Sequence, residues 1–329
     1  MKRISLIVPV YNGEKYLEAM ARSVLEQNWE NLQIIFSDDG SLDRSLEILK
    51  ELEAEHPQVT VVTGENRGVS SARNRALALA DGDYIGFADS DDLLEPGYLD
   101  ALVKLLEETG ADVACCGFTR IYEASGAVDH MPKKSSPVTV TDREGFRALL
   151  LRPDGYTTVM WNKLFRREVL LDGDGEFIRF NEDIHIVEDG EYTFRLPIEK
   201  AVFTSEPCYR YFVRTSGAMY GALTPRKLTE LDARKKIVEK CEGDSKELQD
   251  LAKMKYQKGV RDLMFHAVIG GQGKEVRHLR PELKTFRREM YGSKYLSKKE
   301  KIKYFVYRPL IQMNLRRIGA FLMKKLSGH

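Results

Sequence analysis

The amino-terminal 90 residues alternate short apolar runs with helical segments, and this alternation constrains the fold more than any other feature. Four apolar runs have the length of buried strands: residues 4–10, 32–36, 59–62 and 84–88. Of the three segments between them, two repeat apolar side chains at helical spacing and the third is rich in alanine: residues 14–28, 42–52 and 68–80. Ser41 is predicted to cap the second helix. Strands and helices that alternate over short links predict an α/β fold with a mostly parallel sheet flanked by helices.

The pattern of helices and strands continues beyond residue 90. Helices are predicted at residues 96–109 and 142–151, and strands at residues 113–122, 201–204 and 209–213. From about residue 224 the composition becomes helical and basic. We therefore predict two domains, an α/β domain over residues 1–223 and a basic α-helical region over residues 224–329.

Turn-forming or acidic residues end three of the predicted strands: Pro9 and Tyr11, Asp38 and Asp39, and Asp89 with Asp91. In open α/β sheets ligands bind outside the carboxyl ends of the strands, so these residues should lie along one edge. Asp89 and Asp91 are two residues apart and can converge on one divalent cation, which completes its oxygen shell with water and phosphate. A nucleoside diphosphate with Mg²⁺ or Mn²⁺ fits such an edge.

The charge of the chain is divided between its two parts. Residues 1–225 hold 24 Lys and Arg against 38 Asp and Glu, whereas residues 226–329 hold 27 against 12. A basic carboxyl-terminal part fits an anionic partner such as lipid headgroups or nucleic acid, and the alternative is a solvated helical face. Nucleic acid is the weaker option because no recognised binding motif accompanies the charge.

The last 38 residues have the composition of a helix that lies in a membrane interface. Residues 292–329 contain ten Lys and Arg and one Glu, interleaved with apolar residues and broken at Pro309. Cationic and apolar stripes on one helix favour attachment to an anionic leaflet. The alternative is a basic helical pair that packs on the catalytic domain.

Cysteine usage and hydropathy favour a cytoplasmic location. The four cysteines form no CxxC pair and have no histidine at metal-ligand spacing, so they are interpreted as free thiols. No run reaches the roughly 18 apolar residues of a spanning helix, and the residues before position 4 lack the features of a signal peptide. We expect a cytoplasmic protein that is peripheral on the membrane.

Five segments together resemble the family 2 glycosyltransferases, bacterial inverting enzymes with a Rossmann-like, A-type glycosyltransferase fold. They occur in the order of the family: Val8-Pro9-Val10-Tyr11-Asn12, Asp38-Asp39-Gly40-Ser41, Asn66-Arg67-Gly68-Val69-Ser70-Ser71-Ala72-Arg73-Asn74, Asp89-Ser90-Asp91-Asp92 and Glu188-Asp189. The resemblance covers about residues 3–215. The QxxRW signature of processive members is absent, which favours the addition of one sugar at a time.

The resemblance implies a donor site and a metal site at the predicted edge. The candidates for the donor side are Pro9, Tyr11, Glu14, Asp39, Arg73 and Asp89. A carboxylate at Asp39 can accept the imide N–H of uracil, while Asp38 braces the loop. Asp91, with Asp89, is assigned to Mn²⁺ or Mg²⁺. Arg73 faces the nucleotide in this interpretation; alternatively it pairs with Asp83 or Glu65.

The resemblance also implies a catalytic base and two further contacts. Asp189 is assigned as the base that takes the proton of the acceptor hydroxyl, with Glu188 as its neighbour or an acceptor contact. The alternative is an ordinary helix start with two acids. Trp161 and Lys163 are acceptor-side candidates, although Trp161 is equally consistent with packing. Arg210 and Arg214 lie on the segment that covers the diphosphate in the family, and arginine suits phosphate.

These features predict an inverting glycosyltransferase that adds a hexosyl or N-acetylhexosaminyl group from a nucleotide-sugar, such as a UDP-sugar. The acceptor is expected to be a saccharide or a lipid-linked saccharide in synthesis of a cell-surface polysaccharide such as a capsule. Two alternatives remain at this point. One is a metal-dependent nucleotidyltransferase, which needs no base at Asp189. The other is a non-catalytic module of the same fold that binds glycan or lipid.

Overall fold

The computed structural model describes residues 2–132, 138–153, 155–214 and 223–302. The chain divides into two compact units. The first contains Met1–Leu150, Asp154–Asp183 and Glu188–Thr215, and the second contains Leu151–Pro153, Ile184–Val187 and Ser216–His329. The predicted boundary of the catalytic domain, between residues 223 and 224, stays a prediction.

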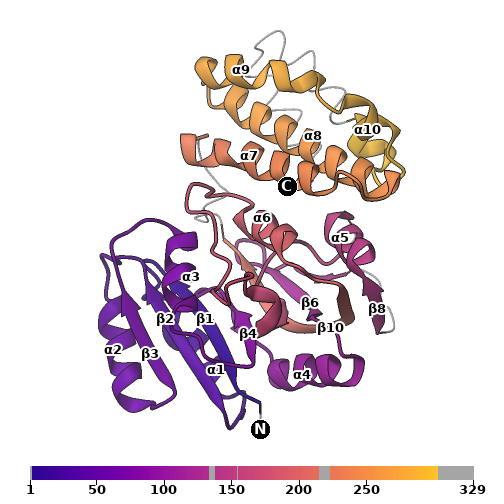
Figure 1. The fold of residues 1–329 in the computed structure, drawn as a ribbon. Coiled ribbons are helices and arrows are strands. Elements are labelled where there is room, and N and C mark those ends of the chain that lie inside the picture. The colour runs from indigo at the N-terminus through magenta and orange to yellow at the C-terminus, as the bar shows by residue number, and fades with distance from the viewer. Residues whose placement is uncertain (1, 133–137, 154, 215–222, 303–329) are drawn as a thin grey trace. The chain divides into compact units, whose positions relative to one another are not determined.

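The first unit is built on a mixed sheet with the strand order β3-β2-β1-β4-β9-β6-β10-β5; β7 pairs with β6 and β8 pairs with β10 (Figure 1). Its strands are β1 Ile4–Val10, β2 Leu32–Asp38, β3 Val59–Thr63, β4 Tyr84–Phe87, β5 Leu93–Leu94, β6 Val113–Tyr122, β7 Val128–Met131, β8 Thr139–Asp142, β9 Lys163–Arg166 and β10 Lys200–Val213. The strands β1 to β4 are parallel to one another, as predicted. All seven residues of β1 are buried, which explains its continuous apolar sequence.

Six helices accompany the sheet within the described part of this unit: α1 Leu17–Leu25, α2 Ser45–Glu55, α3 Val69–Leu77, α4 Tyr98–Thr109, α5 Arg143–Leu151 and α6 Glu188–Arg195. Helix α3 packs on β1, β2 and β3, and α4 packs on β6, β9 and β10. Asp142 begins α5 by accepting from the N–H of Gly145 at 2.9 Å, as predicted. The α/β class of the first unit is thereby confirmed.

Two local predictions were wrong. Helix α2 begins at Ser45, and its amino-terminal turn is held by Asp43, which accepts from the N–H of Ser45 at 3.0 Å. Ser41 does not cap it, because its hydroxyl accepts from the N–H of Asn12 at 3.0 Å and so ties this loop to the end of β1. The strands expected at 201–204 and 209–213 are one strand, β10, whose register to β6 shifts on both sides of Pro207.

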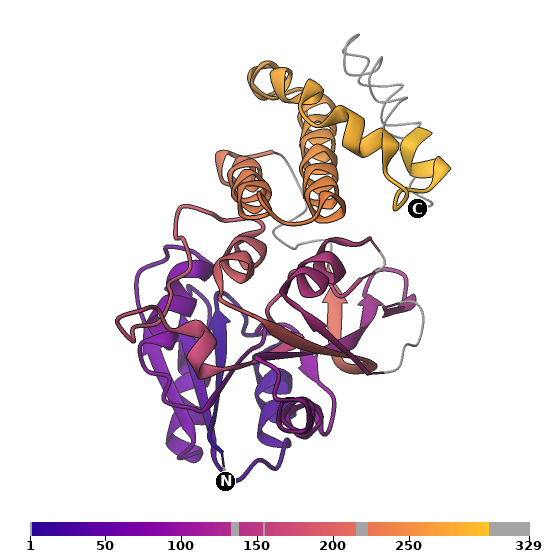
Figure 2. The same ribbon diagram turned by 45° about the vertical axis from the view of Figure 1, so that its right-hand side comes forward.

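The second unit is helical, as predicted from composition. It contains α7 Pro225–Lys240, α8 Lys246–Ile269, α9 Gly273–Leu279 and α10 Arg287–Gly292, with the 3₁₀ turn η2 Pro281–Lys284 between the last two. Helix α8 contacts α7, α9 and α10 (Figure 2). Thr224 and Ser245 cap α7 and α8 with their hydroxyl groups. Within the described residues, no helix is both long enough and apolar enough to cross a bilayer.

The four cysteines are free and buried, in agreement with the prediction of free thiols. The predicted membrane-binding segment, residues 292–329, is described only as far as residue 302. Its remainder, residues 303–329, lies outside the described residues.

Candidate active site

The register of the parallel strands brings the predicted strand ends to one edge. Val10 of β1 pairs with Asp38 of β2, and Ile7 pairs with Phe87 of β4, two residues before Asp89. The loop that follows β1 also approaches the acidic loop, because a Cβ at Gly13 would lie 3.5 Å from the hydroxyl oxygen of Ser90. The predicted arrangement along the carboxyl ends of the strands is therefore present.

Asp38 and Asp39 hold the loops of this edge. Asp38 is buried and accepts from the N–H of Gly40 at 3.2 Å and from the hydroxyl of Thr63 at 2.8 Å, which is the bracing role expected for it. Asp39 accepts from the N–H of Gly68 at 2.7 Å and from the guanidinium of Arg75 at 3.0 Å. Its Oδ1 also accepts from the N–H of Arg67 at 3.2 Å. Since each carboxylate oxygen can accept two hydrogen bonds, Oδ1 is filled and Oδ2 retains capacity for a ligand.

The other donor-side candidates on the β1 loop differ in exposure. Tyr11 is 48% exposed, and its ring is available at the edge. Pro9 is buried within β1. Glu14 accepts from the N–H of Arg44 at 3.0 Å, so it links this loop to the start of α2.

Arg73 joins the acidic loop to the predicted catalytic pair. Its side chain is 3% exposed, and it donates to Asp189 at 2.5 Å and to Glu188 at 3.2 Å. Its second terminal nitrogen lies 3.4 Å from Asp89. Among the described residues, its ion pairs are with these three carboxylates and not with the alternative partners, and Asp83 instead accepts from the N–H of Arg3 at 2.7 Å. One buried cation therefore gathers three carboxylates from two distant segments.

This clustering changes the acid–base properties of its members. Burial, together with the negative charge of Asp189, raises the pKa of Glu188 to about 8, although Arg73 opposes the change. Burial raises the pKa of Asp89 to about 7, with Asp189 and Asp91 adding to the effect and Arg73 opposing it. Burial alone would lower the pKa of Arg73, but its three carboxylate neighbours raise it overall, so it remains a cation.

The side chains of Asp91 and Asp92 in the acidic loop differ in exposure and in their contacts. Asp91 is 44% exposed and accepts from Arg214 at 2.8 Å. Asp92 is buried and accepts from the hydroxyl of Tyr209 at 3.2 Å and from the N–H of Phe212 at 2.9 Å, so it fixes β10. The described residues contain no group of three or more His, Cys, Asp or Glu side chains arranged to hold a metal.

Comparisons with known proteins agree with this architecture. A sequence profile described as "Glycosyl transferase family 2" matches residues 5–173, which is more than half of the chain. The protein belongs to glycosyl transferase family 2. The match ends before Glu188 and Asp189. The prediction that these two residues are catalytic therefore depends on their sequence motif and on their contacts in the structure.

Individual proteins show the same similarity over part of their length. The "uncharacterized glycosyltransferase YibD" of Escherichia coli K12 is 30% identical over 223 residues, which cover 65% of this chain and 62% of that protein, less than two thirds of its length. The chondroitin synthase of Escherichia coli is 41% identical over 117 residues, 35% of this chain and 17% of that protein. The crystal structure of S. aureus TarS 1–349 in complex with UDP-GlcNAc covers 88% of both chains with a TM-score of 0.61 and 20% identity, a likeness of fold.

In this family 2 protein, Trp161 and Lys163 lie in the core. Trp161 is 4% exposed and stacks on Tyr209 and Tyr211 at ring-centroid distances of 4.5 and 5.3 Å, which is the packing alternative. Lys163 is fully buried and donates to the carbonyl oxygens of Thr157 and Val159 at 3.2 and 2.5 Å. Burial lowers its pKa. Neither side chain presents a surface to an acceptor in this conformation, and their acceptor role stays a prediction.

The loop that Lys163 holds contains a contact that the sequence did not reveal. The N–H of Met160 donates to Asp189 at 3.1 Å, on the carboxylate oxygen that Arg73 does not occupy. A backbone donor carries no residue signature, so no sequence motif identifies it. The second missed residue is Arg75, whose ion pair with Asp39 had a visible signal: it follows Arg73 by two positions in the same helix.

The two arginines predicted to cover the diphosphate are placed differently. Arg214 is buried, donates to Asp91 and Glu123, and lies 4.0 Å from the ring centroid of Tyr16. Arg210 forms a two-bond ion pair with Glu95 at 2.5 and 2.8 Å. Arg210 also lines a separate pocket of about 250 Å³ beside α1, and the structure does not bring it to the carboxylate cluster.

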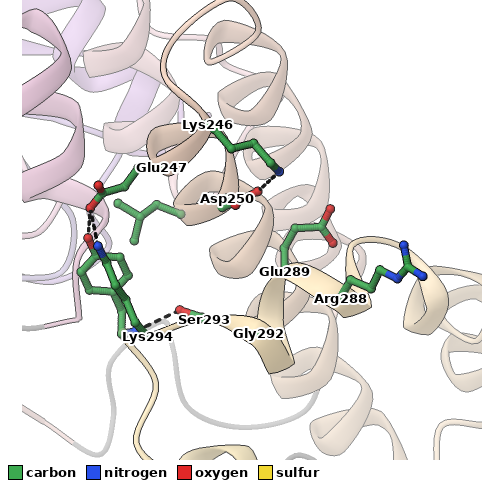
Figure 3. A pocket seen from close by; sticks show the side chains of 10 residues that line it. Lys246, Glu247, Asp250, Arg288, Glu289, Gly292, Ser293 and Lys294 are labelled. Atoms are coloured by element: carbon green, nitrogen blue, oxygen red, sulfur yellow. Dashed lines mark hydrogen bonds and ion pairs between the residues drawn. The ribbon is translucent and has the colours of Figure 1, made fainter.

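The second unit has a pocket for which the sequence predicted no role. It measures about 610 Å³ and is lined by the first turns of α8 and by the residues around α10 (Figure 3). Lys246 pairs with Asp250 at 2.5 Å, and Glu247 pairs with Lys294 at 3.4 Å. The charges within each of these two pairs neutralise one another.

The raised pKa of Glu188 leads to a prediction for stability. Its folded pKa of about 8 lies above its ordinary value of 4.5, so the protonated side chain favours the folded state. This contribution is complete below pH 4.5 and is lost as the pH rises through 8. One pKa unit corresponds to about 1.4 kcal/mol, so we expect Glu188→Gln to be more stable than the wild type at pH 9 by on the order of 1–3 kcal/mol.

Thermal melting of both proteins between pH 5 and pH 9 tests this expectation. The wild type should lose stability with rising pH more steeply than the variant, and the two curves should approach each other toward pH 5. Parallel curves over the whole range would show that Glu188 does not titrate in this interval.

Proposed function

We propose that the protein is an inverting glycosyltransferase that transfers a sugar from a UDP-sugar to a saccharide or lipid-linked acceptor. The observation that carries this proposal is the contact of Arg73 with Asp89 on one side and with Glu188 and Asp189 on the other. It puts the candidate base next to the strand edge where family 2 proteins are expected to hold the donor. A nucleotidyltransferase would share the metal carboxylates but needs no base at Asp189.

Asp189 is suited to act as the base. One of its oxygens is held by Arg73 and the other by the N–H of Met160, so the carboxylate has one fixed orientation. The acceptor hydroxyl attacks the anomeric carbon, its proton passes to Asp189, and the bond from that carbon to the diphosphate oxygen breaks. Attack from the face opposite the diphosphate inverts the anomeric centre.

Asp91, with Asp89, is proposed to hold Mn²⁺ or Mg²⁺. The donor set fits, because carboxylate oxygens are the ligands that such hard cations prefer. Asp91 is 44% exposed and lies in the same loop as Asp89, so its carboxylate is accessible to an ion at the strand edge. When bound, the ion would offset the charge that grows on the departing nucleoside diphosphate.

The donor base is proposed to lie on the β1 side of the edge, near Tyr11 and Asp39. Pro9 near the end of β1 and Glu14 in the loop that follows are proposed to shape this part of the site. Arg214 donates to Asp91, so its guanidinium is proposed to contact the diphosphate. UDP is proposed because the similar fold of TarS was solved with UDP-GlcNAc. The transferred group, hexosyl or N-acetylhexosaminyl, and a role in cell-surface polysaccharide synthesis are extended from the similarity to chondroitin synthase.

Attachment to the cytoplasmic face of an anionic membrane is proposed for the carboxyl-terminal unit. Residues 273–302 alone contain ten Lys and Arg against four Glu. Many of these cations are exposed: Lys274, Arg277, Arg280, Lys284, Arg288, Lys294, Lys298 and Lys299. Each cation near an anionic leaflet contributes about 1 kcal/mol, so this surface would add to the predicted contribution of the tail.

Thermal melting with nucleotides tests the proposed donor site. A ligand at a hundredfold excess over its Kd stabilises the folded state by about 2.7 kcal/mol if it binds only that state. We expect UDP or one UDP-sugar to raise the melting temperature by several degrees with Mn²⁺ and much less with EDTA. GDP and ADP are the control nucleotides for the specificity of the shift.

The outcomes separate the candidate functions. A shift with UDP-sugar and Mn²⁺, followed by release of UDP when an acceptor saccharide is added, supports a glycosyltransferase. Stabilisation by nucleoside triphosphates with release of pyrophosphate would favour the nucleotidyltransferase. No shift with any nucleotide would leave the non-catalytic module and remove the roles given to Asp39, Asp89 and Asp91.

A further inference from the structure

A buried lysine holds the loop that contacts the candidate base. The side chain of Lys163, at the start of β9, is fully buried. Its ammonium donates to the carbonyl oxygens of Thr157 and Val159 at 3.2 and 2.5 Å. It also donates to the side-chain oxygen of Asn162 at 2.8 Å. These three acceptors match the three N–H groups of an ammonium, so the hydrogen-bonding capacity of Lys163 is used entirely within residues 157–162.

The same loop provides one of the contacts that fix Asp189. The N–H of Met160, the residue after Val159, donates to the carboxylate of Asp189 at 3.1 Å. The side chain of Met160 is also buried, and its sulfur lies 3.4 Å from the hydroxyl oxygen of Thr193, four residues beyond Asp189 in α6. All of these residues belong to the first compact unit. The contacts from Lys163 to Asp189 therefore run within one unit.

The backbone of the loop has a conformation that needs support from its surroundings. The φ of Thr157 is +63°, in the left-handed region, where a β-branched residue is a genuine outlier. Such a conformation persists only where the surrounding structure determines it, and it occurs most often at functional sites. The hydrogen bond from Lys163 to the carbonyl oxygen of Thr157 is one contact that holds it. We therefore expect the loop to relax when this bond is removed.

The charge of Lys163 is costly in this place. A buried ammonium loses its hydration, and the three oxygens that accept from Lys163 are neutral. Burial lowers the pKa of Lys163, and the charge of Asp189 is among the effects that oppose this change. An ionised Asp189 therefore favours the charged form of Lys163, which links the lysine to the candidate base by charge as well as by the loop.

We propose that Lys163 is a positioning residue for the transfer reaction: through the loop it sets the place of the Met160 N–H and, with it, the orientation of the Asp189 carboxylate. The inference rests on the proposed function of Asp189 as the base. Arg73 holds only one oxygen of that carboxylate. Without the second contact the base is less well oriented, and a misplacement of about 1 Å can lower a rate about a hundredfold. A positioning role requires no exposed surface at Lys163.

The first test is Lys163→Met in the full-length protein, which keeps the length of the side chain and removes its charge and donors. We expect kcat for sugar transfer to fall at least tenfold, with the KM for donor within twofold and the UDP-dependent melting shift retained. Arg166→Met is the matched control, because Arg166 lies in the same strand and donates to the carbonyl oxygens of Ala111 and Leu106, outside the loop, at 2.9 and 2.8 Å. It should keep kcat within twofold of the wild type.

A double variant tests whether Lys163 acts through Asp189. Residues that act as a unit have strongly non-additive effects on rate. In Asp189→Asn no base remains to be positioned, so adding Lys163→Met should change the residual kcat by less than twofold. A further fall as large as the one in the wild-type background would overturn the inference, because Lys163 would then affect the rate by another route.

Hydrogen exchange gives a result that does not depend on activity. Amide exchange in peptides covering residues 156–163 should be faster in Lys163→Met than in the wild type or in Arg166→Met. Should Lys163→Met fail to fold, Lys163→Gln, whose shorter side chain cannot satisfy all three acceptors, serves for the same measurements.

The results distinguish the inference from the proposed function. Unchanged exchange, or a kcat within twofold of the wild type, overturns the role of Lys163 and leaves the proposed function intact. If the wild type itself transfers no sugar from any donor, the proposed function fails, and the role of Lys163 in the reaction fails with it.

Discussion

Replacing Asp189 with asparagine is expected to lower kcat for sugar transfer by at least a hundredfold and to leave donor binding almost unchanged. General-base catalysis contributes about 10²- to 10⁴-fold, and an amide cannot take the proton of the acceptor hydroxyl. The amide oxygen can still accept from the N–H of Met160 or from Arg73, which hold the carboxylate now. Arg73 keeps Glu188 and Asp89 as counterions, so the fold should survive.

Initial rates at varied donor and acceptor concentrations measure this effect, with UDP-dependent melting as the check on binding. Asp183→Asn is the matched control, because Asp183 is an exposed carboxylate on the same connection to α6. It should keep the kcat of the wild type. If Asp189→Asn retains more than a tenth of the wild-type kcat, the base lies elsewhere or the reaction is a nucleotidyl transfer.

The edge that holds the candidate site could be predicted because parallel strands leave little freedom. Once residues 4–10, 32–36 and 84–88 are recognised as buried parallel strands, their carboxyl ends must meet. The pairing of Val10 with Asp38 in the structure agrees with this expectation. The acidic residues beyond those ends were placed at one edge by topology alone.

The pairing of the charges could not be predicted in the same way. Arg73 and Asp189 are 116 residues apart, and sequence spacing gives no information on which cation meets which carboxylate. Arg73 was also consistent with Asp83 and Glu65, which are nearer in the chain. Only the folded structure shows that Asp89, Glu188 and Asp189 meet the guanidinium of Arg73.

The acceptor-side residues show a different limit. A tryptophan beside a lysine is compatible with a sugar-binding surface and with a core strand, and periodicity does not separate the two. Strand β9, which begins at Lys163, pairs antiparallel to both β4 and β6. Because β9 lies between two strands, Lys163 and the neighbouring Trp161 are buried. No pattern in residues 161–166 predicts this position.

The second large effect is expected at Asp91. We predict that Asp91→Asn abolishes the Mn²⁺-dependent part of the UDP melting shift and lowers kcat by about 10²- to 10⁴-fold. A metal ion that offsets charge on the departing group contributes several kcal/mol, and each 1.4 kcal/mol is tenfold in rate. An amide binds the ion more weakly than a carboxylate does because it carries no charge.

The contacts of Arg214 provide a control variant for Asp91→Asn. Its guanidinium donates to Asp91 at 2.8 Å and to Glu123 at 3.1 Å, so both carboxylates contribute to the same buried cation. Glu123→Gln is therefore a matched control: it weakens the hold on Arg214 but removes no proposed metal ligand. We expect it to keep the Mn²⁺-dependent shift and a kcat within tenfold of the wild type. If both variants lose the shift equally, the effect belongs to Arg214 and the protein does not use Asp91 as a metal ligand. If neither variant loses it, the ion is held elsewhere.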